Sequence, residues 1–214
     1  MKKAILIIII ILLIDQISKI YIKTHFILGE SHLIFGWEKA QILYTQNNGM
    51  AWGAEFGGRT GKLLLTLFRL VAVTGIGYWL YDSVKNNKHK ILIISIAFIF
   101  AGAVGNILDS VFYGIIFDNP QHKVATLFAD EGYESLFYGK VVDMFYFPLW
   151  HGYFPDWVPK FGGSPFTFFN AIFNVADSAI TIGVMLLILF NKKAFPNEEE
   201  PKDEVFLEDT LADK

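Results

Sequence analysis

The stretch NAIFNVADSAITIGVMLLILF, residues 170–190, decides the fold class of this chain. As an α-helix it is about 30 Å long, which is enough to cross the hydrocarbon core of a bilayer. Asn174 and Asp177 lie three residues apart within it and would share one helix face. A carboxylate at that depth costs about 2.5 kcal/mol or more, so it must face protein or a water-filled cavity. We therefore predict a membrane helix with a polar face, which is either structural or functional.

The composition indicates an integral membrane protein with one compact helical bundle. Of the 214 residues, 53% are hydrophobic and only 18% are charged, which is unusual for a soluble enzyme. The chain has no cysteine, which excludes disulfides and thiolate catalysis. Its five histidines lack the spacing of a helical zinc site, and no basic run suggests nucleic acid.

Three further apolar segments complete a predicted bundle of four transmembrane helices, with spans of about 4–22, 62–81, 91–109 and 170–190. The first resembles a signal peptide, but no small-residue cleavage site follows it, so we interpret it as a retained helix. Asp15 and Lys19, near its far end, are four residues apart and can pair. Arg69 lies inside the second span and must either contact a partner or reach the head groups.

Two longer connections separate these spans. Residues 24–60 contain two short strand patterns and the turn signal Asn47-Asn48-Gly49, which together predict a small β element. Residues 110–169 hold many Phe, Tyr and Trp side chains, a composition typical of a segment at the membrane interface. Within it, Asp143 lies among apolar neighbours.

The distribution of lysines predicts the orientation. Lysines at the N-terminus, between the second and third spans, and after the fourth span all fall on one side. The positive-inside rule makes that side cytoplasmic, so both termini are cytoplasmic and residues 24–60 and 110–169 face outward. We expect residues 1–193 to form a single domain. Residues 194–214 carry eight acidic residues and two lysines, and we expect them to be a disordered cytoplasmic tail.

The aspartates suggest acid–base chemistry near one membrane surface. Two close carboxylates cannot both ionise cheaply, so one could take a proton from water while the other donates one. The residues alone leave open several pairings of Asp15, Asp109, Asp143 and Asp177. They also leave open a proton- or ion-coupled transporter and a scaffold whose polar residues only join helices.

Five motifs, taken in order, resemble the lipoprotein signal peptidase (signal peptidase II) family of four-span aspartic proteases. They are D-Q-I-S-K at 15–19, N-N-G-M-A-W-G at 47–53, G-N-I-L-D at 105–109, V-V-D at 141–143 and F-N-V-A-D-S-A-I at 173–180. Each motif is weak alone, but five in order are specific. The resemblance covers nearly the whole chain apart from the tail and parts of residues 110–169.

The resemblance implies that Asp143 and Asp177 are the catalytic pair. It assigns substrate-binding or supporting roles to other polar motif residues, namely Asp15, Lys19, Asn47, Gly49, Asn106, Asp109 and Asn174. The implied substrate is a prolipoprotein carrying diacylglycerol on its lipobox cysteine, with cleavage just before that cysteine. No metal or organic cofactor is implied. The implied setting is the bacterial inner membrane, where the enzyme would contact lipids, act as a monomer and hold its active site toward the outer face.

The chain departs from the family pattern in two ways. An arginine commonly follows the G-N-x-x-D motif, but Ser110 occupies that position here. Arg59 and Lys140 are outward-facing candidates to replace its charge. The connection between Asp109 and Asp177 is also longer than usual, which suggests an aromatic surface insertion. The family further uses a β cradle and an interfacial helix as a lid, and we expect both within residues 24–60.

Overall fold

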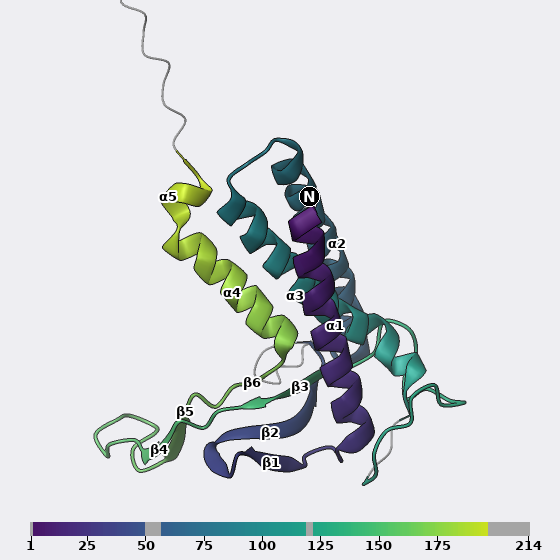
Figure 1. Ribbon diagram of the computed structural model, residues 1–214. Helices are drawn as coiled ribbons and strands as arrows, with labels where there is room; N and C mark the ends of the chain where they lie inside the picture. The colour runs from purple at the N-terminus through teal and green to yellow at the C-terminus, as the bar shows by residue number, and fades with distance from the viewer. Residues whose placement is uncertain (1, 50–56, 119–121, 197–214) are drawn as a thin grey trace, which may run out of the picture.

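The helices gather at one end of the protein and the strands at the other (Figure 1). The computed structural model describes residues 2–49, 57–118 and 122–196. The helices are α1 (Lys2–His25), α2 (Gly58–Lys85), α3 (Lys90–Ile116), α4 (Val175–Leu189) and the short α5 (Asn191–Ala194). The strands are β1 (Ser31–Ile34), β2 (Trp37–Asn47), β3 (Val141–Tyr146), β4 (Trp150–Tyr153), β5 (Pro165–Phe168) and β6 (Ile172–Phe173).

In the described part of the chain, three helices are long and apolar enough to cross a membrane. These are α1, α2 and α3, and each contains the span predicted for it. Large apolar side chains of α1, including Ile9 and Leu13, are about half exposed. Apolar surface of this kind on a membrane-length helix is suited to contact with lipid tails.

The fourth predicted span is wrong at its start. The helix begins at Val175, not Asn170, because Asn174 caps it: the Asn174 side chain accepts from the Asp177 N–H, and the Asp177 carboxylate accepts from the Asn174 N–H. This reciprocal capping box favours a helix start there. Upstream, Ile172 and Phe173 pair with β3 as strand β6. Asn174 therefore lies at the cap of α4 and not within it, and α4 is a 15-residue apolar helix.

The sheet is larger than the sequence predicted. The β1–β2 hairpin lies within residues 24–60 as expected, but the sheet has four strands in the order β1-β2-β3-β6. Strand β3 pairs antiparallel with β2, and Thr45 lies opposite Asp143. Asp143 is therefore held in regular backbone rather than in an irregular loop. Residues 50–56, part of the range 24–60 in which the lid helix is expected, lie outside the described residues, as do residues 197–214 of the expected tail.

Small residues allow α3 to approach α4 closely. Helix α3 packs against α1, α2 and α4. A Cβ atom added at Gly102 would collide with the backbone carbonyl oxygen of Ala176. At Gly183 of α4, an added Cβ would lie 2.6 Å from the carbonyl oxygen of Ser95. Close backbone contact of this kind is how membrane helices gain packing energy without a hydrophobic driving force.

We predict that Gly102→Ala lowers the thermal stability of the purified protein, whereas Gly75→Ala does not. The new methyl group at position 102 must push α4 away, at a cost of about 1–3 kcal/mol. A Cβ atom added at Gly75, in α2, would meet no other atom within 4 Å. Thermal unfolding in detergent measures both variants. Equal melting temperatures would contradict close α3–α4 packing.

Candidate active site

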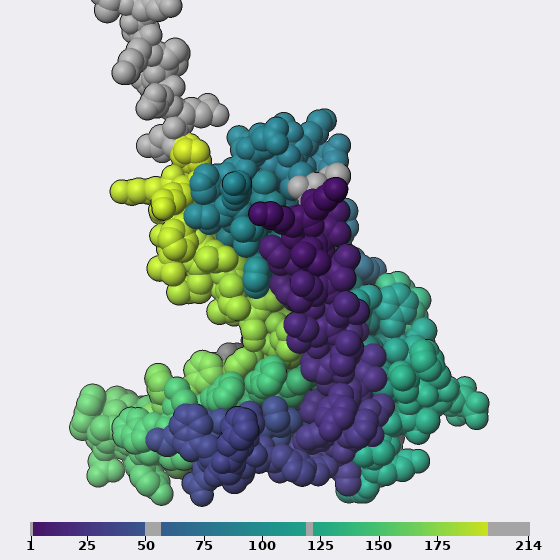
Figure 2. Space-filling view, in the orientation of Figure 1, coloured from purple at the N-terminus to yellow at the C-terminus, as the bar shows by residue number. Residues whose placement is uncertain are grey.

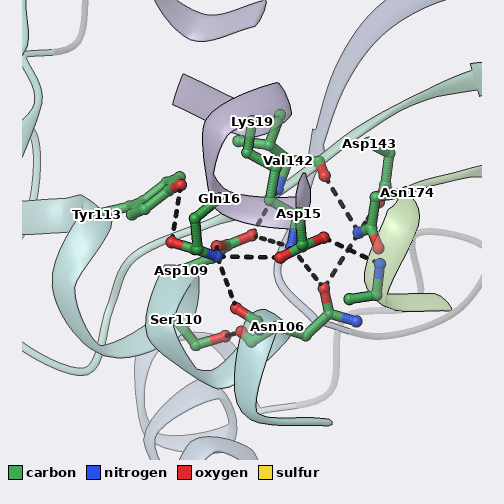
Figure 3. Close-up of polar contacts among 12 residues, drawn as sticks. Asp15, Gln16, Lys19, Asn106, Asp109, Ser110, Tyr113, Val142, Asp143 and Asn174 are labelled. Carbon is green, nitrogen blue, oxygen red and sulfur yellow. Dashed lines mark hydrogen bonds and ion pairs between the residues drawn. The ribbon is translucent and has the colours of Figure 1, made fainter. Parts of the chain in front are cut away.

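Polar side chains from five elements meet where the helices reach the sheet (Figure 3). They come from α1, α3, α4, β2 and β3, and they include every polar side chain predicted for the site: Asp15, Lys19, Asn47, Asn106, Asp109, Asp143, Asn174 and Asp177. Hydrogen bonds and ion pairs join them into one network. Residues far apart in the chain are thereby brought into one site.

Lys19 is the centre of the buried part of this network. Its ammonium group lies 2.9 Å from Asp15 Oδ2 and 2.8 Å from Asp109 Oδ2, and all three side chains are fully buried. It also donates to Asn106 Oδ1 at 2.9 Å. The predicted Asp15–Lys19 pair is thus confirmed, with Asp109 as a second carboxylate partner. Such a cluster is costly to desolvate, and it is stable only when each group finds partners.

Asp15 also fixes the start of α4. Its Oδ1 accepts a hydrogen bond of 2.9 Å from the Ala176 N–H, in the first turn of that helix. A carboxylate at a helix N-terminus satisfies an unpaired N–H group and interacts favourably with the helix dipole. Helix α1 therefore sets the position of the turn that carries Asp177.

Asn174 contacts both Asp143 and Asp177. Its side-chain amide donates to Asp143 Oδ1 at 2.8 Å, and its backbone N–H donates to Asp177 Oδ2 at 3.2 Å. The same amide group lies 3.1 Å from Asn106 Oδ1, and Asn106 Nδ2 donates to Asp177 Oδ1 at 2.8 Å. Two asparagines therefore hold the two carboxylates at one place.

Asp143 has an environment that favours its neutral form. The pKa of its carboxyl is raised to about 7, first by burial and second by the charge of Asp177. Hydrogen bonds from Asn47 and Asn174, together with the charge of Lys19, oppose this rise. Near neutral pH, Asp143 can therefore hold a proton, which is the condition a general acid needs.

The N-N-G turn reaches the site through Asn47. The Asn47 side chain donates to Asp143, and its oxygen accepts from the Gly49 N–H at 2.6 Å. Gly49 has a φ of 90° and so adopts a conformation that favours glycine. Gly49, the remaining predicted site residue, therefore lies at the edge of the network and shapes the turn.

Arg69 is a cation at this site whose partners sequence reasoning did not identify. Its guanidinium donates a hydrogen bond to the carbonyl oxygen of Gly49. It also interacts electrostatically with the carboxylate of Asp177. By contrast, Arg59 pairs with Glu134 at 2.9 Å and lies over the Tyr138 ring. Ser110 is buried, and its hydroxyl donates to the Asn106 carbonyl. For Arg69, the sequence offered one signal of a role in the site: it is a lone arginine inside an apolar span.

The sequence also did not predict that Gln16 and Tyr113 belong to the polar network. The Gln16 amide donates to Asp15 and Asp109 at 3.0 and 3.1 Å, and the Tyr113 hydroxyl donates to Gln16 Oε1 at 3.2 Å. Figure 3 shows Gln16 between the two carboxylates. Its position next to Asp15 in the chain was the one available signal.

These features define a membrane protein with a buried acid–amide site where its helices meet a small sheet. The signal peptidase II family model matches residues 7–192. The lipoprotein signal peptidase of Porphyromonas gingivalis is 46% identical over 184 residues, covering 85% of this chain and 79% of that protein. That of Amoebophilus asiaticus is 38% identical, covering 82% of this chain and 72% of that protein.

A comparison with solved structures agrees with this family match. A bacterial membrane enzyme solved by the in meso method at 2.3 Å resolution aligns with a TM-score of 0.58 and 26% identity, over 94% of both chains. The chain belongs to the signal peptidase II family, whose function is to remove the signal peptide from prolipoproteins. The resemblance of its five motifs to this family is confirmed.

We predict that Lys19→Met strongly destabilises the protein, whereas Arg59→Met has little effect. Losing the ammonium leaves two buried carboxylates without their cation, which costs about 3–5 kcal/mol. The Arg59–Glu134 pair is largely exposed and contributes about 0–1 kcal/mol. Thermal unfolding in detergent compares the two variants. A Lys19→Met protein as stable as wild type would contradict a network held together by this lysine.

Proposed function

We propose that this protein is an aspartic endopeptidase that uses Asp143 and Asp177 as its catalytic pair. The observation that carries the proposal is the contact of Asn174 with both carboxylates. Membership in a peptidase family supplies the reaction class. Two carboxyl groups held together, one of them favouring its neutral form, are suited to general acid–base hydrolysis.

The environment of Asp143, which favours a proton on its carboxyl, suggests how the pair divides the reaction. Ionised Asp177 takes a proton from a water molecule as the water oxygen bonds to the peptide carbonyl carbon. Protonated Asp143 donates a hydrogen bond to the carbonyl oxygen and stabilises its developing charge. The proton on Asp177 then passes to the leaving amine as the C–N bond breaks. No other reactant is needed, so atoms and charges balance.

The substrate follows from the family and from the site's place in the fold. We propose that it is a prolipoprotein with diacylglycerol on its lipobox cysteine, cleaved just before that cysteine. The network joins the start of α4 to β3, and Figure 1 shows that α4 begins beside the sheet. A scissile bond there could reach the aspartates while the acyl chains remain beside the helices. Asp15, Lys19 and Asp109 would support the site's shape, and Asn47, Gly49, Asn106 and Asn174 would position the carboxylates or the substrate.

We further propose a four-span orientation in the bacterial inner membrane, with both termini cytoplasmic. The N-terminus, the α2–α3 connection and α5 lie at one end of the molecule (Figure 1), and all three carry lysines. The positive-inside rule places that end in the cytoplasm and the sheet, the site and residues 110–169 outside. Helix α4 alone is about 22 Å long, so its crossing would depend on adjoining α5. Residues 1–193 would act as one monomeric domain surrounded by lipid.

We predict that Asp143→Asn and Asp177→Asn each abolish cleavage without unfolding the protein. Asparagine keeps the size and polarity of each side chain but cannot exchange a proton. Gel-shift assays with purified protein and diacylglyceryl-modified prolipoprotein measure cleavage, and an unlipidated substrate tests the requirement for lipid. Asp130→Asn, at an exposed position, is the matched control and should remain active. Substantial turnover by either folded catalytic variant would exclude the proposed pair.

We also predict that activity falls as the pH rises through about 7, the pKa of Asp143, because Asp143 then loses its proton. Asn47 donates a hydrogen bond to this carboxyl group and favours its ionised form. Asn47→Leu should therefore raise the pKa of Asp143 and move the alkaline limb of the pH–activity profile to higher pH.

The control for this profile is Gln46→Leu, since Gln46 donates to the Tyr44 hydroxyl instead. Its alkaline limb should match that of wild type. A limb that moves to lower pH in Asn47→Leu would show that Asp143 does not act as the protonated acid.

A further inference from the structure

The hairpin formed by β4 and β5 stands apart from the rest of the sheet. The two strands make a separate two-stranded sheet, with Trp150 opposite Phe168 and His151 opposite Thr167. In Figure 2 the hairpin forms a lobe beside the lower end of α4, with a hollow between the two. An isolated two-stranded hairpin is only marginally stable in water. A surface that covers part of it would therefore stabilise it.

The two faces of the hairpin differ in chemistry. Cross-strand partners share a face, so Trp150 and Phe168 lie on the same face as Gly152 and Phe166. Gly152 leaves room for the Phe166 ring. The centroid of this ring lies 5.3 Å from that of the Trp150 ring and 4.9 Å from that of the Phe154 ring. The opposite face carries Tyr153 and Pro165 together with His151, whose ring lies 3.0 Å from the Thr167 hydroxyl. The hairpin thus has an aromatic face and a more polar face.

Much of this aromatic surface is exposed. Trp150 is 61% exposed, Phe168 58% and Trp157, in the connecting loop, 80%. Residues 147–169 carry one aspartate and one lysine, so their formal charges cancel. A neutral surface of this composition is poorly suited to a strongly charged partner. Clustered Trp, Tyr and Phe side chains are instead typical of the bilayer interface.

The position of the hairpin fits a bilayer interface. It projects sideways from the sheet, at the end of the bundle where the apolar helices stop (Figure 1). Phe147 and Phe169 both contact the ring of Phe173, which lies just before α4. Aromatic residues at both ends of the hairpin therefore reach the base of an apolar helix. A two-stranded sheet also leaves edge N–H and C=O groups without strand partners, which suits the hydrated head-group region but not the hydrocarbon core.

We propose that the β4–β5 hairpin docks its aromatic face and Trp157 into the head-group region of the membrane that the helices cross. This inference rests on the membrane orientation proposed above, and it assigns a partner to one part of the aromatic insertion. The hairpin then forms a lateral extension on the membrane surface next to α4. Its polar face, with His151 and Thr167, points to water.

Site-directed spin labelling tests this proposal directly, because the chain has no cysteine. Single labels at Phe168→Cys and Trp157→Cys report on the aromatic face and the loop, and His151→Cys is the matched control on the polar face. The full chain is reconstituted in vesicles of phosphatidylethanolamine and phosphatidylglycerol. Collisions are measured with molecular oxygen, which concentrates in lipid, and with a water-soluble nickel chelate.

The labels at 168 and 157 should collide more with oxygen than with the nickel chelate, and the label at 151 should show the reverse. Equal, water-like accessibility at all three positions would overturn the proposal. So would a label at 168 that neither reagent reaches, because protein would then cover that face. The same pattern is expected in an Asp143→Asn background, so loss of the proposed catalysis would not affect the result.

Discussion

The buried ion cluster of Asp15, Lys19 and Asp109 is the constraint on which the rest of the site depends. Lys19 is fully buried and pairs with Asp15 of its own helix at 2.9 Å, and its 2.8 Å pair with Asp109 joins α1 to α3. Charges at such a depth are stable only with well-placed partners, so the two helices are restricted to one arrangement. The other oxygen of Asp15 binds the first turn of α4. One cluster therefore positions three helices.

The catalytic proposal follows from this arrangement. Once the start of α4 is fixed, its cap residue Asn174 lies against β3 and donates to Asp143. The capping box that begins the helix also holds Asp177. The same hydrogen bonds that start a helix thus place one carboxylate beside another. Burial and the neighbouring charge then favour a proton on Asp143.

Local patterns in the sequence predicted the parts of the site that depend on spacing along one helix. Asp15 and Lys19 are four residues apart, and Asn106 and Asp109 are three apart, so their shared faces could be expected. Asn106 and Asp109 both contact Lys19, as such a shared face allows. The family motifs added Asp143 and Asp177, whose proximity depends on tertiary structure.

What the sequence did not predict depends on contacts between distant segments. Strand β3 lacks the alternating pattern of a half-buried strand because Val141, Val142, Asp143 and Met144 are all buried. The apolar run before Val175 resembles a continuous helix, and the cap at Asn174 does not interrupt that pattern. The partner of Arg69, a backbone carbonyl at Gly49, carries no side-chain signal. The β4–β5 pairing lies in a stretch of Gly and Pro residues with little periodicity.

Infrared spectroscopy tests the central claim most directly, since protonated and ionised carboxyl groups absorb at different frequencies. The spectrum of the purified wild-type protein below pH 7 would be compared with that of Asp143→Asn under the same conditions. We predict a band from a protonated carboxyl group that is absent in the variant and that disappears in the wild type as the pH rises above about 7. If the two proteins show identical carboxyl bands, Asp143 is ionised throughout, and it cannot be the acid of the pair.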